Sequence, residues 1–190
     1  WWFIANKKLP LQKNGNNMEQ NTYDINKVES YKEDNRLEAK AAQGGVPKSM
    51  WETYSSFANT EGGIILLGVE EKKDHQLVVE GVDDPHKLIS QIWDLVNNRQ
   101  KVNVNILTER MVHAERVDGK DIVVVEVPRA ELSLRPVYLN QTPEDGTYRR
   151  NFEGDYHCDK EQVSAMYRDA SRVSVDQKVL SNLDMSVFCK

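Results

Sequence analysis

The chain changes from helical to strand-like periodicity within the stretch FANTEGGIILLGV, residues 57–69. Asn59 and Thr60 carry polar side chains, and Gly62 and Gly63 permit a tight reversal with close backbone approach. The apolar run after the glycines is six residues long and is bounded by turn signals, as in a strand that is buried on both faces. The stretch therefore predicts the end of a helix, a turn and a buried strand.

The helix before this turn is predicted to span residues 47–59. Its apolar residues recur at helical spacing and form one stripe, which consists of Met50, Trp51, Tyr54, Phe57 and Ala58. Pro47 suits the first turn of a helix, and Ser49 with Glu52 three residues later has the pattern of a capping box. We therefore expect Ser49 to cap this helix.

Further elements follow the buried strand. Residues 77–79 are predicted to be its short partner strand. A second helix is predicted to begin at Asp84, a good N-cap that is followed by a proline at the first helical position. Apolar side chains alternate along residues 102–106, which predicts a half-exposed strand.

A β-hairpin is predicted in the middle of the chain. Residues 111–117 and 121–127 are both strand-like, and they flank Asp118-Gly119. This dipeptide between two such runs is the strongest short-range hairpin signal.

The last third of the chain is rich in loops. Residues 137–139 and 148–150 are predicted to be short strands, and Asp159 with Gln162 predicts the capped start of a final helix. Mixed helices and strands around a central hairpin indicate an α+β fold, with a mixed sheet and packed helices.

Composition limits the class of protein. The chain has 190 residues, a net charge of −5 and 39% apolar residues, so it can form a core and is not uniformly basic. No apolar stretch reaches the length of a membrane span. Cys158 and Cys189 lie far apart and match no zinc motif, which favours reduced thiols in a cytoplasmic protein. We expect a flexible segment at residues 1–27, one domain at 28–172, and a tail or linker at 173–190.

The chain contains no Walker A motif. Residues 44–49 have a similar order of residue types, but Pro47 precedes Lys48 where the motif has a glycine. Because proline has no N–H, it removes a donor from a phosphate-binding loop. The sequence therefore argues against ATP hydrolysis.

Three glutamates are candidate metal ligands. Glu33 and Glu38 are five residues apart, Lys40 follows, and Glu71 ends the predicted buried strand with Glu70 before it. Converging carboxylates bind Mg²⁺ or Mn²⁺, and a nearby lysine neutralises a phosphate. Five-residue spacing brings two side chains together only if the backbone bends, so the spacing alone favours a solvated charged edge.

The segment Tyr148-Arg149-Arg150 combines an aromatic ring with two guanidinium groups. This combination suits contacts with phosphates and stacking on bases. An exposed hairpin with ordinary ion pairs is the alternative.

Several of these segments occur in an order that resembles the Schlafen AlbA-type domain. They are Glu38-Ala39-Lys40, Pro47-Lys48-Ser49, residues 57–63, residues 67–71, Gly81-Val82, Pro136-Val137-Tyr138, Tyr148-Arg149-Arg150 and the helix after Asp159. The resemblance extends over about residues 29–172, and its most specific part is the FANTEGG element. It implies a compact α+β domain of a bacterial DNA-binding or transcriptional regulator-like protein; older descriptions of the family as divergent AAA or RecG-related imply ATP binding.

The same resemblance implies a ribonuclease site. Animal Schlafen proteins use two glutamates and an aspartate, and Glu33 and Glu38 match the glutamates. The aspartate position falls at Glu71 or at Glu70, where glutamate's longer arm changes the geometry. The metal-binding cysteines and histidines of the animal proteins have no match in this chain.

We therefore expect a nucleic-acid-binding domain, with DNA favoured over RNA and no cofactor required for binding. The residues expected to contact phosphates or to orient the binding loop are Lys40, Lys48, Asn59, Thr60, Arg149 and Arg150. A metal-dependent endoribonuclease that holds Mg²⁺ or Mn²⁺ with Glu33, Glu38 and Glu71 is one alternative. A nucleotide or small-ligand sensor and, because of the acidity, an interaction module are two others. A homodimer and a downstream winged-helix domain are further expectations.

Overall fold

The computed structural model describes Val28 and residues 36–181. Its elements in chain order are β1 (Leu37–Lys40), α1 (Met50–Asn59), β2 (Gly63–Leu67), β3 (Val69–Glu71), β4 (Leu77–Val79), α2 (Pro85–Val96), η2 (Glu109–Met111), β5 (Val112–Val117), β6 (Lys120–Val127), η3 (Leu132–Leu134), α3 (Pro143–Gly146), β7 (Tyr148–Asn151), β8 (Gly154–His157) and α4 (Lys160–Ser181).

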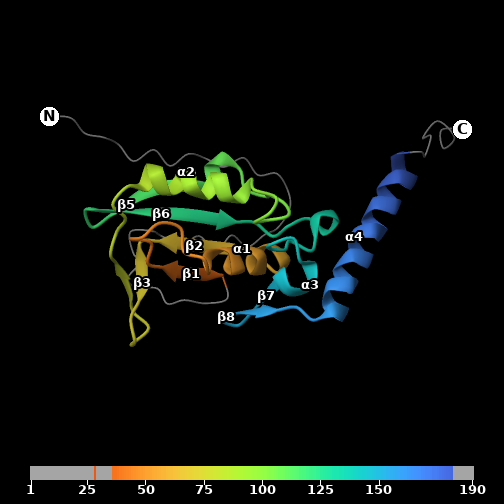
Figure 1. Ribbon diagram of the computed structural model, residues 1–190, viewed down its shortest axis with the longest axis horizontal. Coiled ribbons are helices and arrows are strands. Elements are labelled where there is room, and N and C mark those ends of the chain that lie inside the picture. Colours follow the sequence, from red (N-terminus) through yellow and green to blue (C-terminus); the bar gives the residue numbers. More distant parts are fainter. Residues whose placement is uncertain (1–27, 29–35, 182–190) are drawn as a thin grey trace, which may run out of the picture.

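A four-stranded mixed sheet forms the centre of the fold, in the strand order β1-β2-β6-β5 (Figure 1). Strands β1 and β2 are parallel, with Leu37 opposite Ile64, and the other pairs are antiparallel. Two separate hairpins, β3–β4 and β7–β8, complete the strands. The predicted α+β class, with a mixed sheet and a central hairpin, is confirmed.

Apolar side chains on the two faces of the sheet form two cores. Ile65 and Leu67 of β2 belong to the core that α1 and α2 cover. Leu66 between them points the other way, into a smaller core with the β3–β4 hairpin and Val28. Because successive side chains of a strand alternate between faces, both faces of β2 are buried, as its apolar run predicted.

The two glycines of the FANTEGG turn are required for different structural reasons. Gly62 has a φ of +74°, and a Cβ on it would lie 2.8 Å from the Val127 carbonyl oxygen. A Cβ on Gly63 would lie 2.6 Å from the Phe57 ring and 2.7 Å from the carbonyl oxygen of Arg36. The turn therefore needs glycine once for conformation and close approach, and once for packing against α1.

The central hairpin forms at the predicted dipeptide. Val117 pairs with Lys120, so Asp118 and Gly119 are the two turn residues. Their φ angles are +49° and +79°, which is the type I′ geometry that matches the twist of the flanking strands.

Two of the three predicted helix starts have their predicted caps. The Asp84 carboxylate accepts a hydrogen bond from the Lys87 amide at 2.9 Å. Asp159 and Gln162 form the reciprocal capping box, at 2.7 and 3.0 Å. The capping prediction for α1 is wrong: Ser49 already has helical dihedral angles and its side chain makes no capping bond. An N-cap side chain reaches the amides only from an extended backbone.

Helix α4 continues to Ser181, past residue 172, and extends away from one end of the sheet (Figure 1). In the part of the chain that the structure describes, no helix has the length and apolar character to cross a membrane.

Three further predictions were wrong in detail. Residues 102–106 are not a strand; only Val102 forms a β-bridge, with Leu139. The Tyr54 hydroxyl holds this segment by donating to the Val104 carbonyl and accepting from the Ile106 amide. Its apolar alternation therefore reflects packing against α1 and not a sheet.

The strand at residues 77–79 pairs with β3 and not with β2. The reason is Gly68, whose φ of +94° separates the predicted long strand into β2 and β3. Residues 137–139 were also predicted to be a strand, but they form only isolated bridges, from Tyr138 to Thr147 and from Leu139 to Val102.

Candidate functional site

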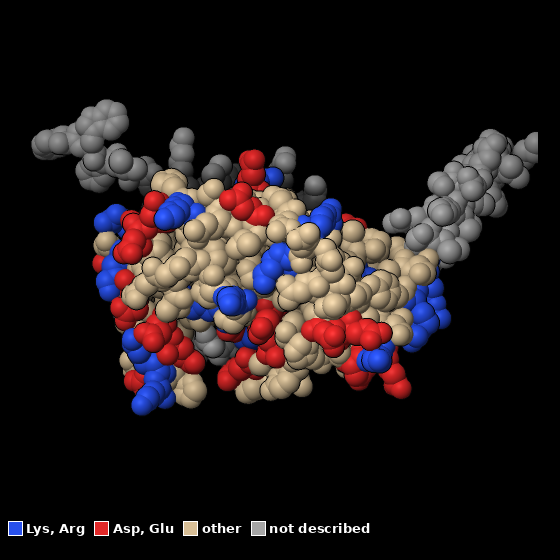
Figure 2. Space-filling view, viewed as in Figure 1, with Lys and Arg blue, Asp and Glu red and all other residues tan. Residues whose placement is uncertain are grey.

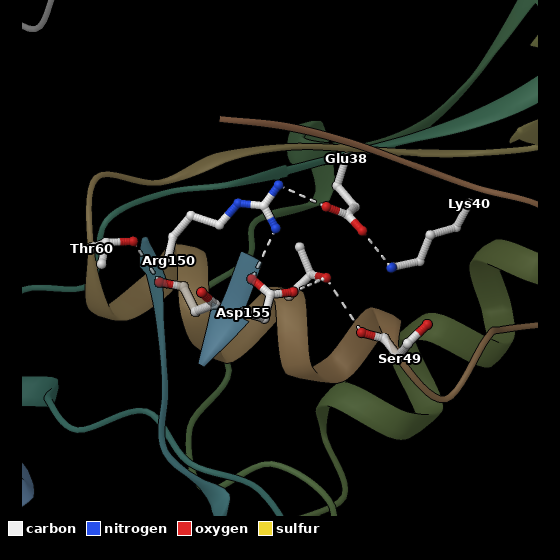
Figure 3. A network of polar contacts seen from close by, with 8 residues as sticks. Glu38, Lys40, Ser49, Thr60, Arg150 and Asp155 are labelled. Carbon is white, nitrogen blue, oxygen red and sulfur yellow. Dashed lines mark hydrogen bonds and ion pairs between the residues drawn. The ribbon is translucent and has the colours of Figure 1, made fainter. Parts of the chain in front are cut away.

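A buried network of charged side chains connects β1, α1, β7 and β8 (Figure 3). Glu38 lies on the edge strand β1 and faces α1, because its neighbours in the strand point into the opposite core. One carboxylate oxygen of Glu38 is 2.7 Å from Lys40 Nζ, and the other is 2.8 Å from Arg150 Nη2. Arg150 Nη1 is 3.0 Å from Asp155, and Thr53 donates a hydrogen bond to Asp155 at 2.7 Å. Two cations therefore balance two carboxylates.

Arg150 is the centre of this network. Its side chain is 3% exposed, lies between Glu38 and Asp155, and stacks over the Phe57 ring at 5.2 Å. Burial alone lowers the pKa of Arg150, but the charges and hydrogen bonds of the two carboxylates outweigh burial and raise it above its ordinary value. The guanidinium therefore stays charged, and both of its terminal nitrogens contact carboxylates inside the domain.

The expected phosphate contact of Arg150 does not fit this geometry. Successive side chains of a strand point to opposite faces, so Arg150 points inward while Arg149 points outward and is exposed. Lys40 is also mostly buried against Glu38, with 13% of its side chain exposed. Of the four basic residues predicted to contact phosphate, Lys48 and Arg149 are exposed.

Asn59 holds the end of α1 to the loop after η3 and to β7. Its amide nitrogen donates to the carbonyls of Val137 and Tyr148 at 2.8 and 3.0 Å, and its amide oxygen accepts from the Val137 amide at 2.9 Å. The residue is only 2% exposed. Asn59 thus fixes the segment at Val137 and β7 to the end of α1, and it is not placed for direct contact with a ligand. The Thr60 hydroxyl donates to the Ser56 carbonyl at 2.6 Å.

The candidate metal ligands have separate partners. Glu38 belongs to the buried network, whereas Glu71 is 2.9 Å from His75 Nδ1. Glu70 pairs with Lys72, and Glu33 lies outside the described residues. Across the described residues, no group of three or more His, Cys, Asp or Glu side chains is arranged to hold a metal ion. The three-glutamate site therefore stays a prediction, and we derive no catalytic step from it.

The glycine loop before α1 lines a polar cleft of about 260 Å³. Gly44 and Gly45 form one side, and Asp83, Asp84 and Lys87 lie on the other. Two carboxylates against one lysine repel a phosphate more than they attract it. This cleft is therefore not suited to a phosphate, and the nucleotide-sensor alternative stays a prediction.

Three arginines from separate segments gather near the C-terminal end of α1, and we call them the arginine surface: Arg129, Arg135 and Arg149. Burial lowers the pKa of Arg135, and the positive charges of Arg129 and Arg149 lower it further. Arg135 Nε donates to the Ala130 carbonyl at 2.8 Å, and the Ala130 amide donates in turn to the last turn of α1. Two of these arginines were missed in the sequence, because each stands alone in a different loop.

The three arginines of the arginine surface differ in how far nearby carboxylates offset their charge. Arg129 is 3.2 Å from the Glu61 carboxylate, and both side chains are exposed. Arg135 is also near Asp169, which partly offsets its charge. Arg149 is exposed and forms no ion pair with another residue that the structure describes. Arg149 is therefore the arginine with the most charge available to a ligand.

The outward face of the β7–β8 hairpin carries Arg149 and an exposed tyrosine ring, and a second exposed aromatic ring lies in the turn that joins the two strands. Tyr156 lies directly opposite Arg149 in the register. Tyr156 is 59% exposed, and Phe152 in the turn is 78% exposed. We call Arg149, Phe152 and Tyr156 the hairpin face.

The chain belongs to the Schlafen, AlbA_2 family, whose model matches residues 31–159. The resemblance drawn from its motifs is thereby confirmed. A similar solved structure is the N-terminal domain of an ATP-dependent DNA helicase RecG-related protein from Nitrosomonas europaea. The two are 32% identical over 65% of this chain and 82% of that chain, with a TM-score of 0.49.

A second solved structure, the DIP2311 protein from Corynebacterium diphtheriae, is 18% identical over 70% of this chain and has a TM-score of 0.48. The match covers 24% of that chain. None of the curated proteins compared with this chain matches it.

Proposed function

We propose that this domain binds nucleic acid through its arginine surface. The observation that carries the proposal is the exposed Arg149, which forms no ion pair with another described residue; Arg129 and Arg135 lie on either side of η3, and Glu61 and Asp169 offset part of their charge. Guanidinium groups donate paired hydrogen bonds to phosphate oxygens, and clustered cations attract a polyanion. The Schlafen AlbA-type resemblance implies the same function, with DNA as the expected ligand.

The rest of the protein surface gives little net attraction for a polyanion, so the arginine surface stands out against it. The chain has a net charge of −5, and Figure 2 shows basic and acidic side chains interspersed over the face in view. Such alternation gives little net attraction at physiological salt, where charges are screened over about 8 Å. An exposed arginine that has no ion-pair partner among the described residues, as Arg149 has none, therefore matters more here than in a basic protein. The arginines would contact phosphates of the nucleic-acid backbone. Because phosphate contacts carry no sequence information, this binding would not depend on the base sequence.

A titration against salt tests the proposal. Fluorescence anisotropy measures the Kd of the full chain for a 20-base-pair DNA of mixed sequence, between 25 and 200 mM NaCl. Arg149→Ala should weaken binding several-fold at 25 mM and reduce the slope of log Kd against log salt by about 0.9, the value for one lost phosphate contact. The matched control is Arg116→Ala, an exposed arginine on the β5–β6 hairpin that pairs with Asp121.

Two results would contradict the proposal. One is the absence of binding at 25 mM NaCl to the duplex and to single-stranded DNA and RNA of the same sequence. The other is an Arg149→Ala variant that binds as well as Arg116→Ala. A tighter Kd for DNA than for RNA would support the DNA-binding form of the proposal, and the reverse would assign it to RNA.

A further inference from the structure

The hairpin face combines two aromatic rings with a cation, and the Tyr156 ring packs against Gly154. A Cβ on Gly154 would lie 2.5 Å from the Tyr156 ring, so the ring rests against the glycine backbone. Gly154 and Tyr156 are two residues apart on one strand and therefore share a face. With 59% of Tyr156 exposed, the glycine supports one side of the ring while much of the rest is open to a ligand.

Phe152 is placed at a cost to the fold. Its φ is +57°, a left-handed conformation that bulky side chains rarely adopt and that favours glycine or asparagine. At 78% exposure the side chain gains little from burial in return. A large ring held in a strained turn and left in water contributes poorly to stability, which points to a role in binding.

The buried network holds the hairpin in place from behind. Arg150 and Asp155 are cross-strand partners on the inward face, and their contacts with Glu38 and Thr53 attach the hairpin to β1 and α1. Because Lys40 and Arg150 balance the charges of Glu38 and Asp155, the carboxylates behind the hairpin add little repulsion to a phosphate in front of it. The hairpin is thus attached firmly to β1 and α1 by a network whose charges are balanced.

We propose that the hairpin face binds single-stranded nucleic acid, with bases stacked on Tyr156 and Phe152 and a backbone phosphate held by Arg149. The inference rests on the proposed function and specifies its ligand. Unpaired bases expose the faces that stack on aromatic side chains, whereas a duplex keeps them inside its own stack. Glu153 lies in the turn beside Phe152, so the phosphate contact belongs to the Arg149 end of the hairpin.

The test separates bases from phosphates. The full chain is titrated at 50 mM NaCl with dT20, with rU20, and with a 20-mer of abasic units that has the same phosphates and no bases. We expect wild type to bind at least one of the base-bearing oligomers about tenfold more tightly than the abasic one. Tyr156→Leu and Phe152→Leu remove a ring and keep an apolar side chain; each should lose about fivefold or more in affinity for that oligomer, the lower end of the effect of one stacked base.

Controls keep the outcomes distinct. Both leucine variants should bind the abasic 20-mer as wild type does, which also shows that they are folded, and Arg116→Ala should bind dT20 and rU20 unchanged. A dT20 with one 2-aminopurine should lose fluorescence on binding wild type and less on binding Tyr156→Leu. Leucine variants that bind like wild type while Arg149→Ala is weakened would overturn the hairpin inference and leave the proposed function standing. A wild-type chain that binds no oligonucleotide would overturn both.

Discussion

Two adjacent arginines of β7 allow a matched comparison of an inward and an outward cation. Replacing Arg150 by alanine leaves the carboxylates of Glu38 and Asp155 without their shared guanidinium, although each is only 12–13% exposed. Removing one partner of a buried ion pair costs about 3–5 kcal/mol, and the partial exposure of these carboxylates favours the lower end. We therefore expect Arg150→Ala to reduce the free energy of unfolding by about 3 kcal/mol.

The same substitution one residue earlier should have a different effect. Arg149 is exposed, and substitutions at such surface positions usually change stability by less than about 0.5 kcal/mol. For a chain of this size, a loss of about 3 kcal/mol lowers the Tm by on the order of 10 °C. Arg149→Ala should thus melt like wild type.

Urea denaturation followed by tryptophan fluorescence measures both effects, since Trp51 is 1% exposed in the core. A second substitution tests the cause. In Arg150→Ala, Glu38 keeps Lys40, whereas Asp155 loses its cation among the described residues; the further change Asp155→Asn removes this uncompensated charge and should recover part of the lost stability. The reasoning is refuted if Arg150→Ala costs no more than Arg149→Ala, or if Asp155→Asn makes the Arg150→Ala variant still less stable.

Three further predictions concern single positions. Gly63→Ala should destabilise the domain by about 1–3 kcal/mol in urea, because its Cβ would lie 2.6 Å from the Phe57 ring; unchanged stability would show that the turn can relax. Tyr54→Phe should cost about 1–2 kcal/mol by removing the hydroxyl that both donates to and accepts from the adjacent loop; an equal thermal midpoint would contradict this. Burial raises the pKa of Cys158 to about 11, so in Cys189→Ser its alkylation by iodoacetamide at pH 8 should be about a hundredfold slower than in urea and should rise tenfold per pH unit towards pH 10; a plateau near pH 9 would rule out the raised pKa.

Local chemistry made some of the fold predictable. Asp118-Gly119 specifies its turn because both residues tolerate a positive φ, and Asp84 caps α2 through an amide only three residues away. Residues 102–106 were misassigned because their alternation arises from packing against α1, which local sequence does not reveal. The capping of α1 failed because the residues before Met50 already turn helically.

The candidate site was harder to predict for a related reason. Alternation along a strand implies that Arg149 and Arg150 face opposite ways, but only the packing of β7 on α1 shows which of them is inside. Arg129 and Arg135 stand in separate loops and meet Arg149 only after the sheet and α1 have assembled. Charge clusters made from distant segments leave no pattern in the sequence.

The buried ion network also has a consequence for the order of assembly. Thr53 and Asp155 are 102 residues apart in the chain, and Glu38 receives its second cation from the same late hairpin. Closing so long a loop is entropically expensive, so contacts of this kind tend to form after local ones. The sheet and its two helices can gather while Glu38 has only Lys40 beside it, and the β7–β8 hairpin then docks as the piece that completes the charge balance. The last step of folding would therefore also be the step that brings the hairpin face, Arg149, Tyr156 and Phe152, into its final position on the surface.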